Sequence, residues 1–209
     1  MSRFLIADDH TVVRKGLKQI LLEAYPFAVI EEVGDAESLL QRVIREPWDV
    51  VISDISMPGR SGLEVLQQIR QTHPRLPVLI LSVHPEDQYA IRVLRAGASG
   101  YLNKDSAPEE LVKAVERVLT GKKYITASIA EKLATTLDTD ADKLPHEHLS
   151  DREFEVLKLL AGGKAVSEIA QQLSLSVTTV STYRARILSK MNLKTNADLT
   201  LYSVENKLL

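Results

Sequence analysis

The first 120 residues alternate short aliphatic runs with longer amphipathic stretches, and this alternation constrains the fold more than any other feature of the chain. Short aliphatic runs are typical of buried parallel strands, and strands that alternate with helical stretches indicate βαβ units. We therefore predict an α/β domain with a doubly wound, five-stranded parallel sheet. The expected strands are 4–7, 29–33, 50–53, 78–81 and 100–102, and the expected helices are 11–24, 36–45, 62–72, 86–95 and 108–119.

Four of the expected strands end in charged or hydroxyl side chains. Asp8 and Asp9 follow the first strand, Asp54 the third, Ser82 the fourth and Lys104 the fifth. Open α/β sheets bind their ligands just beyond the carboxyl ends of the strands, so these groups should meet at one edge. Such a set can hold Mg²⁺ and carry a phosphoryl group on a carboxylate.

The position of each group suggests its role. Asp54 ends the strand that reads as most buried, which is a suitable place for a nucleophile, and Asp8 and Asp9 are natural ligands for Mg²⁺. Lys104 and Ser82 can contact phosphoryl oxygens. Taken alone each residue indicates little, because an Asp-Asp pair after a strand is usually a helix cap. Only their combination favours a phosphate-handling site.

The composition restricts partners and location. The chain has 26 basic and 28 acidic side chains and a net charge of -2, so any nucleic-acid surface must be local. Without cysteine there are no disulfides, thiolate nucleophiles or cysteine zinc sites, which fits a reducing cytoplasm. The first apolar run stops at Asp8, too early for a signal peptide, and no run approaches the roughly 18 apolar residues of a membrane span. We expect a cytoplasmic protein.

A second, all-helical domain is expected after the strand pattern ends at residue 121. A helix over 127–137 and a polar linker over 138–148 should precede it. Ser150 and Glu153 form a predicted capping box for a helix that ends near Ala161, and three more helices are expected over 166–173, 177–191 and 196–208. We predict a phosphoacceptor domain over 1–121, a helix and linker over 122–144, and a helical domain over 145–209.

The third of these helices concentrates positive charge. Residues 147–209 contain eight basic and seven acidic side chains, yet 177–194 contains four basic and no acidic ones. Small polar residues near a helix start, followed by arginines, suit the DNA major groove, and Ser176 is a suitable cap. The predicted buried stripe is Val180, Tyr183, Ile187 and Met191, and the predicted outward residues are Thr178, Thr179, Ser181, Thr182, Ala185, Arg186 and Ser189.

Residues 3–120 resemble the receiver domain of two-component response regulators, a flavodoxin-like fold. The resemblance rests on Asp8-Asp9, on Asp-Ile-Ser-Met-Pro-Gly at 54–59, on Ser82 and on Gly-Tyr-Leu-Asn-Lys at 100–104. It implies that Asp54 accepts a phosphoryl group from a phosphohistidine of a sensor histidine kinase. It further implies that Ser82 and Tyr101 form a switch pair. The implied ligands of Mg²⁺ are Asp9, Asp54 and the backbone carbonyl of Ser56, with Asp8 acting through water.

Residues 149–209 resemble the LuxR-type helix-turn-helix of the NarL/FixJ response regulators. The matching stretches are Leu-Ser-Asp-Arg-Glu at 149–153, Val-Ser-Glu-Ile-Ala at 166–170, Leu-Ser-Val-Thr-Thr-Val at 175–180 and Lys-Met-Asn-Leu at 190–193. The resemblance implies that 177–190 is the reader helix. The expected DNA-binding residues are Thr178, Thr179, Ser181, Thr182, Arg184, Ala185, Arg186 and Lys190, and the expected dimer contacts in the last helix are Leu199, Leu201, Tyr202 and Val204.

Together these features predict a transcriptional response regulator that is phosphorylated on Asp54, forms a homodimer and binds promoter DNA. It would be a switch, catalysing only its own phosphorylation and dephosphorylation. One alternative is a phosphatase of the haloacid dehalogenase type, although that class has an acid where this chain has Ser56. Another is a receiver joined to a protein-binding helical module. His10 is read as a surface residue at a helix start, His146 and His148 as linker residues, and Trp48 as a packing residue.

Overall fold

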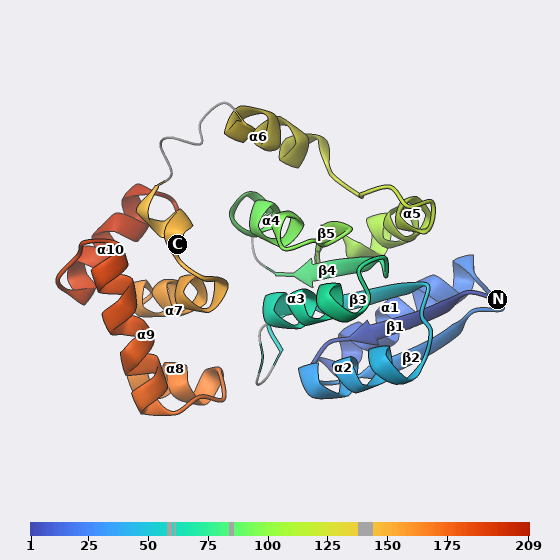
Figure 1. Ribbon diagram of the computed structural model, residues 1–209, viewed down its shortest axis with the longest axis horizontal. Coiled ribbons are helices and arrows are strands. Elements are labelled where there is room, and N and C mark those ends of the chain that lie inside the picture. Colours follow the sequence, from blue (N-terminus) through green and yellow to red (C-terminus); the bar gives the residue numbers. More distant parts are fainter. Residues whose placement is uncertain (58–59, 61, 84–85, 138–143) are drawn as a thin grey trace. The chain divides into compact units, whose positions relative to one another are not determined.

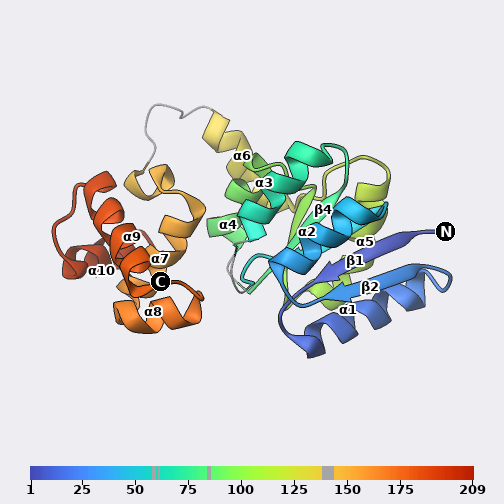
Figure 2. The same ribbon diagram turned by 60° about the horizontal axis from the view of Figure 1, so that its bottom comes forward.

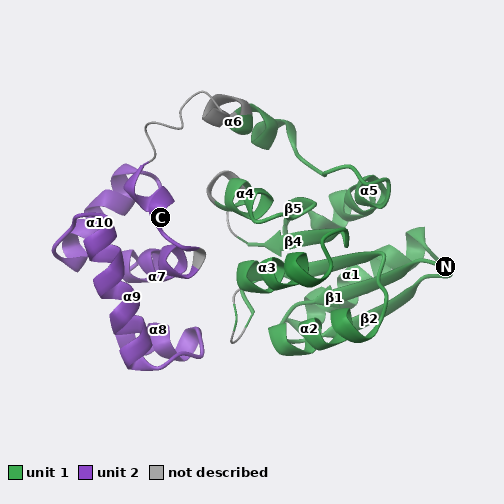
Figure 3. Ribbon diagram, viewed as in Figure 1, with its two compact units in different colours: residues 1–134 green, residues 135–209 purple. Residues whose placement is uncertain are grey.

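The computed structural model describes residues 1–209 except 58–59, 61, 84–85 and 138–143 (Figure 1). The chain forms two compact units, residues 1–134 and 135–209 (Figure 3). The predicted linker over 138–148 falls partly outside the described residues, and its last part, Pro145–His148, forms a 3-10 helix, η1. The finer predicted boundaries at residues 121 and 144 stay predictions.

The first unit contains the predicted five-stranded parallel sheet, in the order β2-β1-β3-β4-β5 (Figure 1). Each predicted strand and helix is present, with ends that differ by at most one residue. The strands are β1 (Arg3–Ala7), β2 (Val29–Val33), β3 (Val50–Asp54), β4 (Val78–Ser82) and β5 (Gly100–Asn103), and the helices are α1 (Thr11–Ala24), α2 (Ala36–Arg45), α3 (Gly62–Thr72), α4 (Glu86–Arg95) and α5 (Ala107–Leu119).

Helices cover both faces of this sheet (Figure 2), which is why every residue of the central strands β3 and β4 is buried and most are aliphatic. Helices α1 and α5 pack together on one face, where Leu17, Leu111 and Val115 meet Phe4 and Ile6 in a continuous core. Helices α2 and α3 contact each other on the opposite face. The strand ends are therefore positioned by packing on both faces of the sheet.

The strand order reverses between β1 and β3, and such a switch point is where open α/β sheets bind ligands. Strands β1 and β3 are neighbours in a parallel register that pairs Ala7 with Ser53. The next residues along the two strands, Asp8 and Asp54, consequently lie at the same edge.

The start of α5 differs from what its sequence predicts, since Ser-Ala-Pro-Glu at 106–109 is typical of a capping box with proline in the first turn. Ser106 precedes this helix, and a proline stands in the first turn as expected, but the Ser106 side chain makes no capping hydrogen bond. Its hydroxyl instead donates to the Asn103 carbonyl over 3.1 Å. The backbone of Ser106 is already helical, and a capping side chain requires an extended backbone at that position. The predicted capping box is therefore wrong here.

The second unit packs four helices around an apolar core that includes Phe154, Leu157, Ile169 and Val180. Its first helix starts with the predicted capping box of Ser150. The last three helices end one to three residues earlier than predicted. The elements are α7 (Asp151–Ala161), α8 (Val166–Gln172), α9 (Val177–Lys190) and α10 (Asn196–Glu205), and α6 (Ala127–Leu137) precedes them and spans the boundary between the two units.

The early helix ends have the same backbone cause at all three places. Ser174 follows α8 with φ of 53°, Asn192 follows α9 with φ of 55°, and Lys207 follows α10 with φ of 54°. Each adopts the left-handed conformation that stops a helix. Within the described part of the chain, no helix combines the length and apolar character that a bilayer crossing requires.

Candidate phosphoacceptor site and reader helix

The strand-end acids form one cluster in the first unit. Asp8, Asp9, Asp54 and His10 each offer a ligand atom, and these atoms lie within 4.8 Å of one another. Asp8 is fully buried, the Asp54 side chain is 3% exposed and Asp9 is partly open to solvent. Carboxylate oxygens are the ligands that Mg²⁺ prefers, so the donor set fits this ion. The predicted proximity of the three acids is confirmed.

Lys104 joins two of these acids. Its ammonium nitrogen is 2.7 Å from Asp8 Oδ2 and 2.7 Å from Asp54 Oδ2, and its side chain is only 11% exposed. The backbone holds it there, because the Lys104 amide donates to the Ser82 carbonyl over 2.9 Å. Asn103 supports the same turn by accepting a hydrogen bond from the Asp105 amide. The lysine therefore balances two buried negative charges.

Asp54 also has a contact besides the one with Lys104. Asp54 Oδ1 accepts a 3.1 Å hydrogen bond from the Ser56 amide. Burial raises the pKa of Asp54 above its usual value, and the nearby Asp8 charge adds to this, although the Lys104 bond opposes both. Burial alone would lower the pKa of Lys104, but its bonds to Asp54 and Asp8 outweigh that effect and raise it. Lys104 therefore stays charged at neutral pH.

Gly62 holds α3 close to the end of β3. Its amide donates to the Ile55 carbonyl over 2.8 Å, and a Cβ at this position would lie 2.5 Å from the Asp54 carbonyl oxygen. Real Cβ atoms essentially never approach so closely, so only glycine fits without a backbone shift. The sequence prediction placed Gly62 at the start of a helix but did not foresee this contact.

The imidazole of His10 lies beside Asp8 and Asp9. This histidine is the residue before α1 and its side chain is 65% exposed, as expected of a helix-start surface residue. Its ring nevertheless contacts the acids, since Nδ1 is 2.7 Å from Asp9 Oδ1 and 3.1 Å from Asp8 Oδ1. Arg14 was also missed by the sequence prediction. Its guanidinium donates to the Asp8 carbonyl and to Thr11 Oγ1, which fixes the turn that carries both acids.

Ser82 and Tyr101, the predicted switch pair, are both buried on neighbouring strands. Ser82 pairs in register with Asn103, and Tyr101 pairs with Ile80, so the two residues lie two positions apart along β4 and β5. Tyr101 is among the largest fully buried side chains of the chain. The ring is thus already inside the protein in this conformation. The predicted role of the pair and of the Ser56 carbonyl stays a prediction.

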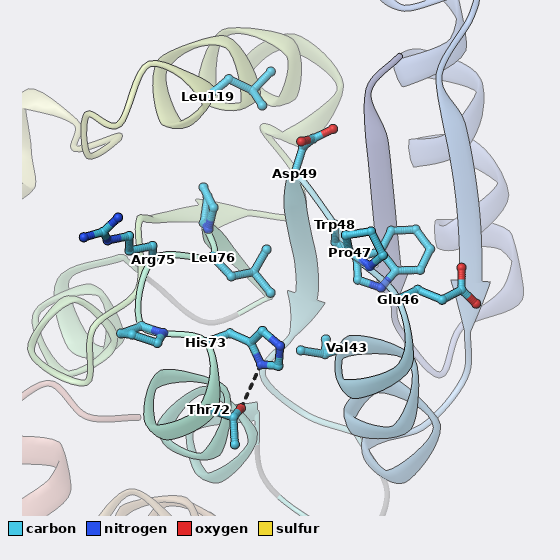
Figure 4. Close-up of a pocket in the computed structure, with 12 residues that line it drawn as sticks. Val43, Glu46, Pro47, Trp48, Asp49, Thr72, His73, Arg75, Leu76 and Leu119 are labelled. Atoms are coloured by element: carbon cyan, nitrogen blue, oxygen red, sulfur yellow. Dashed lines mark hydrogen bonds between the residues drawn. The ribbon is translucent and has the colours of Figure 1, made fainter.

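A pocket of about 610 Å³ lies at the opposite edge of the sheet, where β3 and β4 begin (Figure 4). Its two acidic residues have partners, because Glu46 pairs with Arg3 and Asp49 accepts from the Arg3 amide. Trp48 is buried, stacks under the Arg3 guanidinium and donates to the Arg42 carbonyl, which confirms its packing role. None of the predicted site residues lines this pocket.

Most of the residues that were predicted to face outward on helix α9 are exposed. The Ser176 cap of this helix accepts from the Thr179 amide over 3.0 Å, as predicted. Val180, Ile187 and Met191 are buried, whereas Tyr183 is only half-buried, so the apolar stripe is narrower than expected. The exposed residues of the predicted outward set are Thr178, Ser181, Thr182, Ala185, Arg186 and Ser189, and Thr179 is half-buried.

Two basic residues of α9 have partners within the protein. The Lys190 ammonium is 2.6 Å from Glu153 Oε2, and this carboxylate is buried at the start of α7. Arg184 Nε donates to the Asn196 side chain over 2.6 Å. Both residues therefore hold the reader helix against neighbouring helices, a role that charge pattern alone did not reveal. Arg186, in contrast, points its charge toward solvent.

The predicted dimer contacts on α10 divide into two groups. Leu199 is fully buried in the core and is not available for a partner. Tyr202 is half-buried, and its hydroxyl lies 2.8 Å from His146 Nδ1, so His146 packs in the domain and is more than a linker residue. Leu201 and Val204 are exposed, which leaves them as the available contacts. The packing of α10 against its neighbours, which the sequence pattern does not reveal, decides which of these four residues are exposed.

Comparison with known proteins agrees with this architecture. Residues 4–116 match the family described as "Response regulator receiver domain", and residues 147–203 match "Bacterial regulatory proteins, luxR family". The chain is 35% identical to the response regulator UvrY of Escherichia coli (strain K12), over 100% of this chain and 96% of UvrY. It is 37% identical to the oxygen regulatory protein NreC of Staphylococcus carnosus (strain TM300), over 99% of each.

Solved structures give the same result. The structure of RcsB from Salmonella enterica serovar Typhimurium, bound to promoter rprA in the presence of phosphomimetic BeF3-, is 28% identical. It covers 97% of this chain and 98% of that chain, with a TM-score of 0.64. The chain therefore belongs to the NarL/FixJ family of response regulators, in which a receiver domain precedes a LuxR-type helix-turn-helix domain. It is a DNA-binding transcription regulator, so neither the phosphatase alternative nor the protein-binding alternative is supported.

Proposed function

We propose that Asp54 accepts a phosphoryl group from a phosphohistidine of a sensor histidine kinase, and that this modification promotes dimerisation and promoter binding. The observation that carries the proposal is the position of the Asp54 carboxylate. It ends a buried strand at the switch point of the sheet, with Lys104 at 2.7 Å and the Ser56 amide at 3.1 Å. No other carboxylate of the described residues combines these features.

The chemistry follows from these neighbours. An Asp54 oxygen attacks the phosphorus atom of the donor, the bond from phosphorus to the histidine nitrogen breaks, and the imidazole leaves with a proton from solvent. An acyl phosphate on Asp54 results. Mg²⁺ held by Asp8, Asp9, Asp54 and the Ser56 carbonyl would neutralise the oxygens during transfer. Lys104 can then move its charge from the carboxylate to a phosphoryl oxygen. Hydrolysis of this acyl phosphate resets the switch, and we propose no other catalytic activity.

Ser82 and Tyr101 would report the modification. The Ser82 hydroxyl is near the end of β4, whose last carbonyl already binds the Lys104 amide, so it is within the same network. We propose that it turns toward the phosphoryl group and that Tyr101, buried on the next strand, stabilises the resulting conformation. Phosphorylation would thereby shift a population of receiver conformers rather than create a new one.

For DNA we propose that α9 enters the major groove. Thr178, Thr179, Ser181, Thr182 and Ala185 would approach the bases, and Arg186 would contact phosphate. Arg184 and Lys190 also belong to the proposed interface. On DNA, Arg184 would leave Asn196 or contact DNA in addition to it, and Lys190 would do the same with Glu153. RcsB, a relative of this chain, has been solved on promoter DNA, which supports duplex DNA as the ligand. Because that target is bacterial promoter DNA, we place the protein's action in the cytoplasm.

The acceptor assignment is tested by mass. The protein is incubated with a small acyl phosphate donor and Mg²⁺, and the mass of the intact chain is measured before and after acid treatment. We expect one acid-labile phosphoryl group on the natural chain and on Asp49→Asn, whose exposed carboxylate lies at the opposite edge of the sheet. We expect none on Asp54→Asn. Full phosphorylation of Asp54→Asn would show that the acceptor is another residue.

The link from phosphate to DNA needs a second experiment. Bound sequences are selected from random duplex DNA with and without beryllofluoride, a phosphoryl mimic, and the oligomeric state is measured by analytical ultracentrifugation. We expect beryllofluoride to enrich one consensus and to increase the dimer fraction. An exposed charge at the proposed dimer contact, Leu201→Glu, should reduce both effects. Equal selection with and without the mimic would contradict phosphate control.

A further inference from the structure

The imidazole of His10 lies against the acid cluster, although neither the sequence pattern nor the proposed function gives it a task there. Nδ1 is 2.7 Å from Asp9 Oδ1 and 3.1 Å from Asp8 Oδ1. Among the described residues, His10, Asp8, Asp9 and Asp54 form the set whose ligand atoms gather within 4.8 Å. A nitrogen donor therefore accompanies the three carboxylates that we assign to Mg²⁺.

The two kinds of donor favour different metals. Mg²⁺ prefers oxygen ligands and keeps several waters, so an imidazole contributes little to its binding. Zinc and other late first-row dications accept imidazole nitrogen readily, and they generally bind mixed nitrogen and oxygen sites more tightly than Mg²⁺ does. Adding a histidine to a carboxylate site should change which metal is preferred more than it changes Mg²⁺ affinity.

We propose that His10 Nδ1 is a direct ligand of a late first-row transition-metal dication at this site, together with the carboxylates. The inference rests on the metal site of the proposed function and extends it to metal selectivity. It means that the receiver takes Co²⁺ or Zn²⁺ more tightly than its carboxylates alone would allow. The carboxylates still suffice for Mg²⁺.

The surroundings of His10 leave the ring available for this role. Its side chain makes no capping hydrogen bond to α1, so the helix does not need the imidazole. Its backbone amide donates to Asp8 Oδ1 over 2.8 Å, which keeps this oxygen on the side of the ring. The neighbouring cations lie elsewhere, because Lys104 contacts the Oδ2 atoms of Asp8 and Asp54, and Arg14 donates to the Asp8 carbonyl.

The other described histidines do not offer a comparable set. His146 Nδ1 is 2.8 Å from the Tyr202 hydroxyl in the second unit. His73 directly follows α3 at the opposite edge of the sheet, and its Nδ1 is 2.9 Å from Thr72 Oγ1 (Figure 4). His73 is therefore a suitable control, since it lies in the same unit as His10 and away from the acids.

The test measures binding of Mg²⁺, Co²⁺ and Zn²⁺ to the full-length protein by isothermal titration calorimetry. His10→Gln should weaken Co²⁺ and Zn²⁺ binding about tenfold and change Mg²⁺ binding less than about twofold. His73→Gln should change neither. The visible absorption of bound Co²⁺ should also differ between the natural chain and His10→Gln, because a nitrogen ligand is lost. Thermal unfolding checks that His10→Gln folds, which we expect for an exposed side chain.

The outcomes separate this inference from the proposed function. If His10→Gln leaves Co²⁺ binding and its spectrum unchanged while Mg²⁺ binds normally, His10 is not a ligand and the carboxylate site stands. A loss of the same size for Mg²⁺ and Co²⁺ would also overturn the selectivity claim. If the natural chain binds none of the three ions, or if Asp9→Asn binds them as tightly as the natural chain, the metal site itself is wrong, and this inference falls with it.

Discussion

The two units of this protein use charge in opposite ways. In the receiver, Asp8 and Asp54 are buried and Lys104 is nearly so. Burial and the Asp8 charge raise the pKa of Asp54, and the Lys104 charge lowers it. In the helix-turn-helix domain, Arg186 and the small polar residues of α9 are mostly exposed, so they act on whatever approaches from solvent. Charges interact far more strongly in a low-dielectric interior than in water. Buried charge therefore sets chemistry, whereas exposed charge sets partners.

One contact within the second unit is an exception to this contrast. Lys190 belongs to the basic reader helix, but its ammonium pairs at 2.6 Å with Glu153, a carboxylate that is only 4% exposed. In this respect it resembles Lys104 more than Arg186. The comparison thus predicts that two basic residues of the same helix, Arg186 and Lys190, respond differently to mutation.

The largest effect is expected from Lys104→Met. Removing this cation leaves the buried carboxylates of Asp8 and Asp54 uncompensated and should lower the free energy of unfolding by about 3 kcal/mol without Mg²⁺. Added Mg²⁺ should restore part of the loss, because it binds the folded state. Urea unfolding with and without Mg²⁺ measures both. Some phosphorylation should survive, while the DNA response is lost.

The control for this variant is Lys113→Met. Lys113 pairs with Glu110 at 3.0 Å on the exposed surface of α5, and such pairs contribute about 0 to 1 kcal/mol. If Lys104→Met were as stable as Lys113→Met without Mg²⁺, the acid cluster would be solvated more than its burial indicates, and the contrast between the two units would be weaker.

Gly62→Ala should have the next largest effect on the receiver. The added methyl group would meet the Asp54 carbonyl and the Ile55 backbone, so α3 or the acceptor loop must shift at a cost of about 2 kcal/mol. Because the shift reaches Asp54, the phosphorylation rate should fall as well. Gly16→Ala is a matched control, since a Cβ there meets nothing within 4 Å. Equal stability of the two variants would exclude the close approach.

Lys190→Met and Arg186→Met test the comparison directly within α9. Lys190→Met should lower the free energy of unfolding by about 1 kcal/mol, because Glu153 loses its cation, and Arg186→Met should not. For DNA affinity we expect the opposite order, with the larger effect from Arg186→Met. Arg186→Met should reduce the slope of log affinity against log salt concentration by about 1 and weaken all sequences alike. A changed consensus with an unchanged slope would mean that Arg186 reads bases.

The smallest effect concerns pH. Burial acts to raise the pKa of Glu153, but the bonds from Lys190 and from Ser150 outweigh it, so the folded-state pKa is lowered. A lowered pKa contributes stability that is present above the unfolded value of about 4.3 and is lost as pH falls through the folded value. The stability difference between the natural chain and Lys190→Met should therefore shrink below about pH 4. A constant difference from pH 7 to pH 3 would contradict the pairing.

The sequence by itself determined the elements and the meeting of the strand-end charges at one edge of the sheet. Strand runs such as 50–53 are local patterns, and a parallel sheet brings every strand end to one edge, so Asp8, Asp54 and Lys104 could be assigned without coordinates. The Ser150 cap could also be predicted from the sequence, since a capping box depends on residues only three positions apart. Where the physical cause is local, or is fixed by the fold class, the pattern is sufficient.

Only the tertiary structure decided which side chains meet across helices. Lys190 and Glu153 are 37 positions apart, and His146 and Tyr202 are 56 apart, so no periodicity connects them. The need for Gly62 likewise arises because a helix start approaches a strand end. Each of these contacts depends on how packed elements are oriented, and a small rotation of one helix would separate the partners. Hydrophobic patterning specifies the buried face of a helix, but the fit of neighbouring surfaces fixes its polar contacts.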